Sequence, residues 1–217
     1  MRWSLLSAAF ALSVNTAGAQ SGSDAPEPIV NISIATGVLV LQDIEDGPSN
    51  SRWDFGVIRQ HRASIDRSIG NNTSVGLTLG YAALPMHYEQ LRPGQVTQLA
   101  CNQRCTANAD LWTLGATLRV VSGTSLHHLI ELNAMVNQFS NFREEETNAK
   151  LAPLDGDRDV LFTAGYGFGW AASRHFQIAL IGDVGFTVHT RAGRESDLNR
   201  VNQLVMARLM VRSGIGR

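Results

Sequence analysis

The sequence predicts an all-β protein, namely an eight-stranded antiparallel up-and-down β-barrel that crosses a membrane. Apolar and polar residues alternate with a period of two along eight segments of the 217-residue chain. Short and long connections alternate between these segments. One face of a typical segment is apolar for about ten residues, which is the length of a tilted transmembrane strand.

The first residues have the features of a cleaved signal peptide, which we expect at 1–19. Arg2 gives a positive start, an apolar run follows, and Ala17-Gly18-Ala19 matches the small-x-small cleavage rule. Residues 20–28 form a polar leader, and 29–217 are expected to form the barrel. Export through a signal peptide predicts an oxidising compartment.

The first four expected strands are 29–41, 53–67, 73–84 and 110–121. Valine and isoleucine alternate with asparagine and serine in the first. The third alternates valine, leucine and tyrosine with serine, glycine and threonine, and the fourth alternates tryptophan and leucine with threonine, glycine and arginine. The second alternates poorly, so its register stays open.

The last four expected strands are 126–139, 160–170, 175–190 and 200–212. Aliphatic residues oppose glutamate and asparagine in the first of these, and aromatic residues oppose threonine and glycine in the next. In 175–190, aliphatic residues and phenylalanine oppose glutamine, aspartate and glycine. In 200–212, valine, alanine and leucine share one face, whereas asparagine, arginine, leucine and methionine share the other.

The connections predict which end of the barrel faces which compartment. The short ones have the composition of hairpin turns and are expected on the periplasmic side, and the longer polar ones are expected to form four external loops. The short connections are 69–72, 122–125 and 172–174, and the long ones are 43–52, 86–109, 140–159 and 191–199.

The composition of the two faces indicates that the apolar face points at lipid. The polar face is rich in glycine, serine, threonine and asparagine, and the chain holds a single lysine, Lys150. Such a face suits a narrow barrel interior better than a soluble surface, which is usually rich in charge. The charges on this face must pair or stay hydrated, so they predict an interior arginine–carboxylate network of Arg119, Glu131, Asp183 and Arg208.

Aromatic residues are predicted to mark both membrane interfaces. Tyr81 and Trp112 lie near the loop ends of their expected strands, and Trp170 and Phe176 flank a proposed periplasmic turn. Amphipathic rings at the two ends of an apolar band are typical of interfacial girdles.

Two segments carry a resemblance to a known family, namely 74–81 (SVGLTLGY) and 163–170 (TAGYGFGW). Together with the signal peptide and the strand pattern, they make the chain similar to the small outer-membrane barrels of the OmpA/OmpX and OmpW type. The resemblance implies a place in the bacterial outer membrane, contact with its lipid and lipopolysaccharide, and insertion by the barrel-assembly machinery. Such proteins commonly end in an aromatic residue that this machinery reads, whereas this chain ends in Arg217.

The two cysteines, Cys101 and Cys105, fall in the longest expected loop. In an exported protein this spacing favours a local disulfide at the loop tip, with a small effect on global stability because the closed loop is short. A metal site would need further ligands, and His87 is the only histidine in that loop.

No metal, cofactor or catalytic site is expected from the remaining motifs. Asp155, Asp157 and Asp159 have the spacing of a calcium loop, but the glycine and glutamate that such a loop needs are missing, which favours a solvated acidic loop. Ser140 and His189 could belong to a lipid hydrolase, but no nucleophile, base and orienting acid fall together in the sequence.

The sequence therefore favours a structural or surface-interaction scaffold that presents four external loops to an unknown extracellular ligand. A narrow pore for small solutes and a secreted lipocalin-like ligand-binding barrel are the alternatives. The formal net charge of -1 and the lack of a basic, aromatic-interleaved patch argue against nucleic acid as a partner.

Overall fold

The computed structural model describes residues 29–70, 72–91, 101, 104–173, 175–189 and 201–215. The expected signal peptide and leader at 1–28, and the expected loop at 191–199, lie outside the described residues. No helix among the described residues has the length and apolarity to cross a bilayer.

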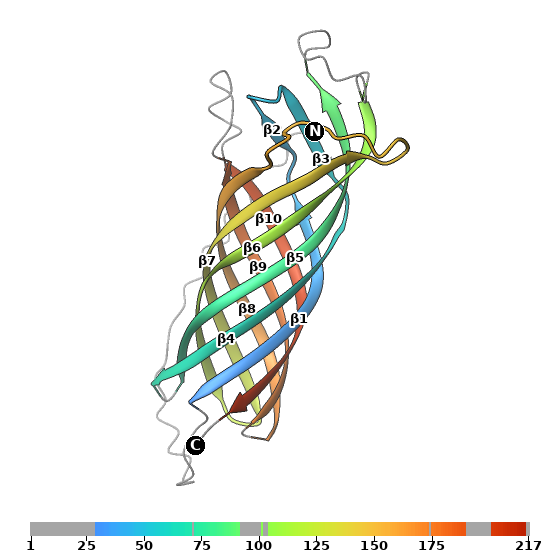
Figure 1. Cartoon of the computed structure of the whole chain (residues 1–217). Coiled ribbons are helices and arrows are strands. Elements are labelled where there is room, and N and C mark those ends of the chain that lie inside the picture. Colours follow the sequence, from blue (N-terminus) through green and yellow to red (C-terminus); the bar gives the residue numbers. More distant parts are fainter. Residues whose placement is uncertain are drawn as a thin grey trace, which may run out of the picture.

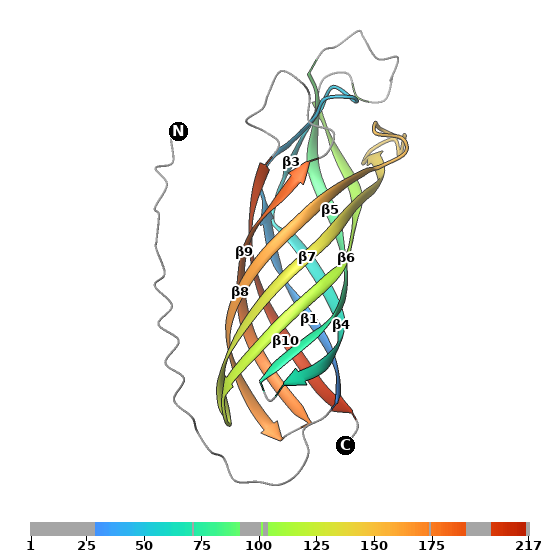
Figure 2. The same ribbon diagram turned by 90° about the vertical axis from the view of Figure 1, so that its left-hand side faces the viewer.

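Eight long antiparallel strands close into a tilted barrel, as the alternation predicts (Figures 1 and 2). Each long strand pairs with the next long strand along the chain, including β5 with β6. The first, β1, also pairs with the last, β10, so the ring has no open edge. The long strands are β1 (Val30–Leu41), β4 (Ile58–Gly70), β5 (Thr73–Gln90), β6 (Arg104–Gly123), β7 (Leu126–Glu144), β8 (Asp157–Ser173), β9 (Phe176–His189) and β10 (Val201–Ile215).

Two short strands, β2 (Ile44–Asp46) and β3 (Ser51–Phe55), form a hairpin between β1 and β4. The expected second strand, 53–67, is therefore split between β3 and β4. Residues 56–57 separate these two strands, and both pair with β5. This end of the barrel also holds the connection 145–156, and we call it the loop end. The opposite end, where β4 joins β5 and β6 joins β7, is the turn end (Figure 1).

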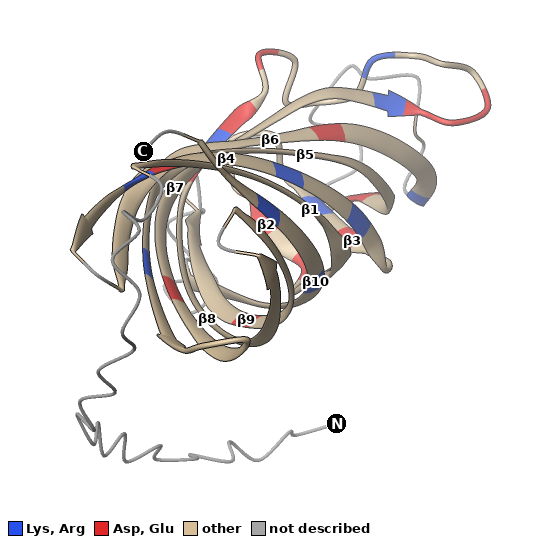
Figure 3. Cartoon of the chain, turned by 90° about the horizontal axis from the view of Figure 1, so that it is seen from below, with Lys and Arg blue, Asp and Glu red and all other residues tan. Residues whose placement is uncertain are grey.

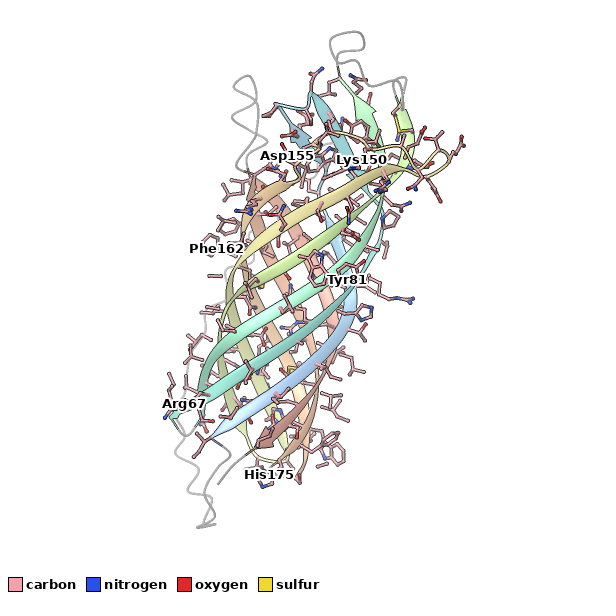
Figure 4. The ribbon with its side chains drawn as sticks, in the orientation of Figure 1. Arg67, Tyr81, Lys150, Asp155, Phe162 and His175 are labelled. Atoms are coloured by element: carbon pink, nitrogen blue, oxygen red, sulfur yellow. A yellow bond between two sulfur atoms is a disulfide. The ribbon has the colours of Figure 1, made fainter. Side chains whose placement is uncertain are left out.

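The apolar face points outward over the main part of the barrel. On β5, the outward side chain of Leu77 is 60% exposed, whereas the inward side chain of Thr78 is 4% exposed. Leucine, valine and phenylalanine side chains form the same outward belt on the other strands, and Figure 4 shows Phe162 pointing away from the barrel. The predicted assignment of the two faces is confirmed for this belt.

The strands continue past the belt at the loop end, and there the two faces exchange polarity. Beyond Tyr81, the outward positions of β5 include His87, and the inward positions become Leu84 and Met86. On β6, the outward Asn108 likewise alternates with inward alanines. This exchange is physically required where a strand leaves lipid for water, because the outer face then meets solvent and the inner face must supply the core.

The expected loop boundaries are wrong for this reason. The segments 86–90, 104–109 and 140–144 fall in expected loops, but the structure places them in β5, β6 and β7. Their alternation is the reverse of that in the apolar belt, so it does not continue the pattern that predicts the strands.

The inner face is also less polar than expected. At the loop end, a core of buried apolar side chains fills the barrel and includes Trp53, Leu111, Phe139, Leu151 and Met206. A smaller buried cluster around Leu129 and Ile181 lies further toward the turn end. The polar interior that the sequence predicts thus lies between the loop-end core and the turn end, where Asn31, Ser74 and His127 are buried.

Candidate functional site

The barrel interior holds two polar clusters that are built from different strands. One is a chain of ion pairs among basic and acidic residues of β4, β6, β7, β9 and β10. The other lies at the loop end and joins β2, β8 and β9. Figure 3, a view from the turn end, shows that charged positions occur on strands around the ring.

Arg119 on β6 is the centre of the first cluster. It donates through Nε and Nη2 to Glu131 Oε2, at 3.0 and 2.8 Å, and through Nη1 to Asp66 Oδ1 at 2.6 Å. Arg119 and Glu131 are directly paired across β6 and β7. All three side chains are almost completely shielded from solvent.

Arg208 and Arg212 on β10 extend the cluster in two directions. Arg208 Nη2 lies 2.5 Å from Glu131 Oε1, and Arg208 Nε donates to Asp183 Oδ2 at 2.8 Å. Arg212 Nη2 lies 2.5 Å from Asp66 Oδ2. The result is a chain of six alternating charges, which we call the charge ladder: Arg212, Asp66, Arg119, Glu131, Arg208 and Asp183.

The six residues of the charge ladder are electrically balanced, with three cations and three anions. A fourth buried arginine, Arg62 on β4, lies beside them and donates to Gln60 Oε1 at 2.9 Å. Balance and multiple hydrogen bonds are what a buried ionic cluster needs, because an isolated charge in this interior would be very costly. A glycine makes room for it: a Cβ on Gly165 would lie 2.4 Å from Asp183 Oδ1. Gly165 on β8 thus allows the Asp183 carboxylate to approach the barrel wall.

The structure brings together all four charged residues that the sequence analysis named, Arg119, Glu131, Asp183 and Arg208. Sequence reasoning missed Asp66 and counted Arg212 only as an inward residue. Asp66 lies in the segment that alternates poorly, and the pairing of β1 with β4, which sets Asp66 opposite the inward Asn31, is what places it inside.

The second cluster consists of Asp46, Asp157, Asp159 and His189, which we call the rim cluster. His189 Nδ1 lies 2.8 Å from Asp159 Oδ1 and 3.0 Å from Asp157 Oδ2, and Nε2 lies 3.7 Å from Asp46 Oδ1. These side chains are 0% exposed in the pairs with His189. Trp53 contacts the imidazole edge-on, with ring centroids 5.7 Å apart.

The rim cluster corrects the interpretation of the acidic motif as a solvated loop. Asp155 is exposed in the connection before β8, but Asp157 and Asp159 are inward positions of β8 and are buried. Their spacing of two residues puts both on the inner face of one strand. Ser140 lies on β7 opposite Asp110, so the structure does not support its grouping with His189.

The four aromatic residues named from the sequence lie on the outer surface at two levels. Tyr81 and Trp112 are paired across β5 and β6, with ring centroids 4.8 Å apart, at the level where the faces exchange polarity. Tyr81 donates its hydroxyl to Asp110 at 2.9 Å. Trp170 and Phe176 are exposed near the turn end. This placement is compatible with interfacial girdles, which stay a prediction.

The disulfide Cys101–Cys105 is present. It lies at the base of the external connection and not at its tip, because Cys105 belongs to β6 and pairs with Tyr88 on β5. Cys101 is buried in the loop-end core. The bond therefore links the start of β6 to a cysteine in the loop-end core.

No protein-family model and no curated protein matches the chain. Among solved structures, Neisserial surface protein A has 10% identity and a TM-score of 0.50, with 86% of this chain and 97% of that one covered. OprG of Pseudomonas aeruginosa has 9% identity and a TM-score of 0.47, with 88% and 98% covered. Ail of Yersinia pestis has 10% identity and a TM-score of 0.42, with 88% and 100% covered. At these identities the similarity concerns the fold.

Proposed function

Since the chain has the fold of small outer-membrane β-barrels, we propose that it lies in the bacterial outer membrane and acts there as a closed scaffold that presents external loops to an extracellular ligand. The proposal has two parts, namely the location and the closed interior, and each has its own support.

The outward apolar belt supports the membrane location. Soluble proteins seldom expose a contiguous apolar patch larger than a few hundred Å², whereas here leucine, valine and isoleucine are exposed on strands around the barrel. Examples that are about 60% exposed are Ile34, Leu77, Leu114, Leu180 and Val184. The secreted lipocalin-like carrier needs the opposite orientation, with the apolar face inward, so this observation argues against it.

The filled interior is the observation that carries the scaffold function. Along the barrel axis, the apolar core around Trp53 and Phe139 occupies the loop end, and the charge ladder lies between this core and the turn end. The three arginine side chains of the charge ladder donate hydrogen bonds to carboxylates on other strands, which fix them inside the barrel. These two layers argue against the narrow-pore alternative.

Partners are expected at the loop end and around the belt. Above the belt, the outer face carries polar side chains of both signs, including the ion pairs Arg52–Asp43 at 2.5 Å and Arg104–Asp54 at 3.7 Å. The hydrogen bond to Asp43 raises the pKa of Arg52, so this guanidinium stays charged. Such a surface suits lipopolysaccharide headgroups around the barrel, with the loops left for a ligand from outside.

Conductance across planar lipid bilayers tests the closed scaffold. The full mature chain, inserted into the bilayer, is expected to give no steady single-channel current at neutral pH, because the charge ladder and the core block the lumen. A water-filled porin measured in the same bilayers is the positive control. Steady ohmic channels, or rapid swelling of liposomes in small sugars, would contradict the closed scaffold and favour the narrow pore for small solutes.

A further inference from the structure

The rim cluster has the composition and spacing of a metal site. One carboxylate oxygen each of Asp46 and Asp157 and one nitrogen of His189 lie within 4.8 Å of one another. We propose that Asp46, Asp157 and His189 bind a divalent transition-metal ion, of which Zn²⁺ is the type, and that Asp159 positions the histidine. The site goes beyond the scaffold function.

The hydrogen bonding of His189 orients one ring nitrogen toward Asp46. An ionised carboxylate only accepts hydrogen bonds, so Nδ1 donates to Asp159 at 2.8 Å. In the neutral imidazole, Nε2 then carries the lone pair. This is the arrangement of carboxylate, histidine and metal that occurs in zinc sites, where the carboxylate fixes the tautomer and the ring orientation.

The distance from Nε2 to Asp46 Oδ1 fits two ligands of one ion. At 3.7 Å it is too long for a hydrogen bond, and Nε2 is a buried nitrogen that makes no hydrogen bond among the described residues. Two ligands about 2.1 Å from a zinc ion, at the tetrahedral angle, lie about 3.4 Å apart. Small adjustments of these two side chains would therefore accommodate the ion. The Asp157 carboxylate, whose Oδ2 lies 3.0 Å from Nδ1, would turn toward Nε2 to complete the ligand set.

The donor set selects the class of ion. Imidazole with carboxylates suits zinc and other late first-row metals, whereas calcium and magnesium prefer oxygen ligands alone. Asp46 Oδ2 accepts a hydrogen bond from the Ser49 amide at 3.0 Å, which holds this carboxylate in place. Trp53 and the apolar core form the inner side of the site.

A metal at this site would join parts of the barrel that the sheet does not connect directly. Asp46 comes from β2, which pairs with β3 alone, whereas Asp157 and His189 come from the adjacent strands β8 and β9. The ion would thus fasten the β2–β3 hairpin across the loop end of the barrel.

Metal binding to the untagged mature chain in detergent micelles tests the proposal. After removal of metals with a chelator, equilibrium dialysis against Zn²⁺ is expected to give about one ion per chain with saturation. His189→Gln and Asp46→Asn are expected to weaken binding at least about tenfold, and Asp159→Asn about tenfold through loss of the orienting hydrogen bond. Asp155→Asn and His127→Gln are matched controls, outside the rim cluster, that are expected to bind as the parent does.

A second readout needs no variant. Co²⁺ added to the parent chain is expected to give a visible absorption spectrum that Zn²⁺ removes. The shift of the barrel on gels between unheated and heated samples shows that each variant is folded. Absence of saturable binding to the parent would overturn the proposal, and His189 would then be an imidazolium paired with the aspartates. Equal affinities in the His189 and Asp46 variants and the controls would overturn it as well, since the ion would be bound elsewhere.

Discussion

At the scale of single residues, Glu131 is the position on which the interior depends most. Its two carboxylate oxygens accept from different arginines, Oε2 from Arg119 and Oε1 from Arg208, and Oε1 also accepts from Asn133 at 3.1 Å. Removal of this charge would split the charge ladder and leave two buried guanidiniums with one fewer partner each. Removal of one partner of a buried ion pair lowers the stability of a protein far more than replacement of the whole pair, because the other charge is left buried and unpaired.

Glu131→Gln is therefore expected to lower the free energy of unfolding by about 3–5 kcal/mol. Urea-induced unfolding in lipid vesicles, followed by tryptophan fluorescence, measures this. Glu146→Gln, in the exposed connection after β7, is the matched control and is expected to change stability by less than about 0.5 kcal/mol. Similar stabilities for the two variants would show that the charge ladder does not hold the interior together.

At the scale of the strand, the exchange of polarity along β5 and β6 is the main structural feature. In the belt, apolar side chains face outward and small polar ones face inward, and beyond Tyr81 the arrangement is reversed. With the proposed membrane location, the exchange marks where β5 and β6 pass from lipid to water. Figure 4 shows Arg67 near the turn end and Lys150 and Asp155 at the loop end, on opposite sides of the belt.

Two arginine substitutions on the outward face of β5 test this assignment. Leu77→Arg is expected to cost about 2–4 kcal/mol of folding free energy, because it places a charge in the apolar belt. His87→Arg, ten residues further on the same face, is expected to be close to neutral, since that position is exposed beyond the belt. Equal costs in vesicle unfolding would contradict a lipid boundary between the two positions.

At the scale of the whole molecule, the sequence predicts the barrel well because two regularities recur along the entire chain. Period-two alternation identifies seven of the eight barrel strands. The connections give their up-and-down order and place the poorly alternating β4 between β1 and β5. The loop-end extension escaped prediction because its alternation is inverted, and the β2–β3 hairpin escaped because the segment around Trp53 alternates poorly. In both places, which residues face inward depends on whether the outer face meets lipid or water, and the alternation alone does not give this.

The candidate sites were less predictable than the fold. Four members of the charge ladder are visible as charges on a polar face, whereas Asp66 needs the register of β4. The rim cluster combines residues more than 140 positions apart, Asp46 and His189, so no local motif reveals it. The spacing of Asp157 and Asp159 is visible in the sequence, but only their inward direction on β8 shows that they face the histidine.

The most direct test of the account is the depth of β5 side chains in a lipid bilayer. Environment-sensitive labels on cysteines introduced one at a time at Leu77, Leu79 and His87 would be quenched by brominated acyl chains or by a water-soluble quencher. We predict quenching by the acyl chains at the two leucine positions and by the aqueous quencher at His87. Quenching of all three from water would contradict the membrane-embedded barrel and its boundary near Tyr81.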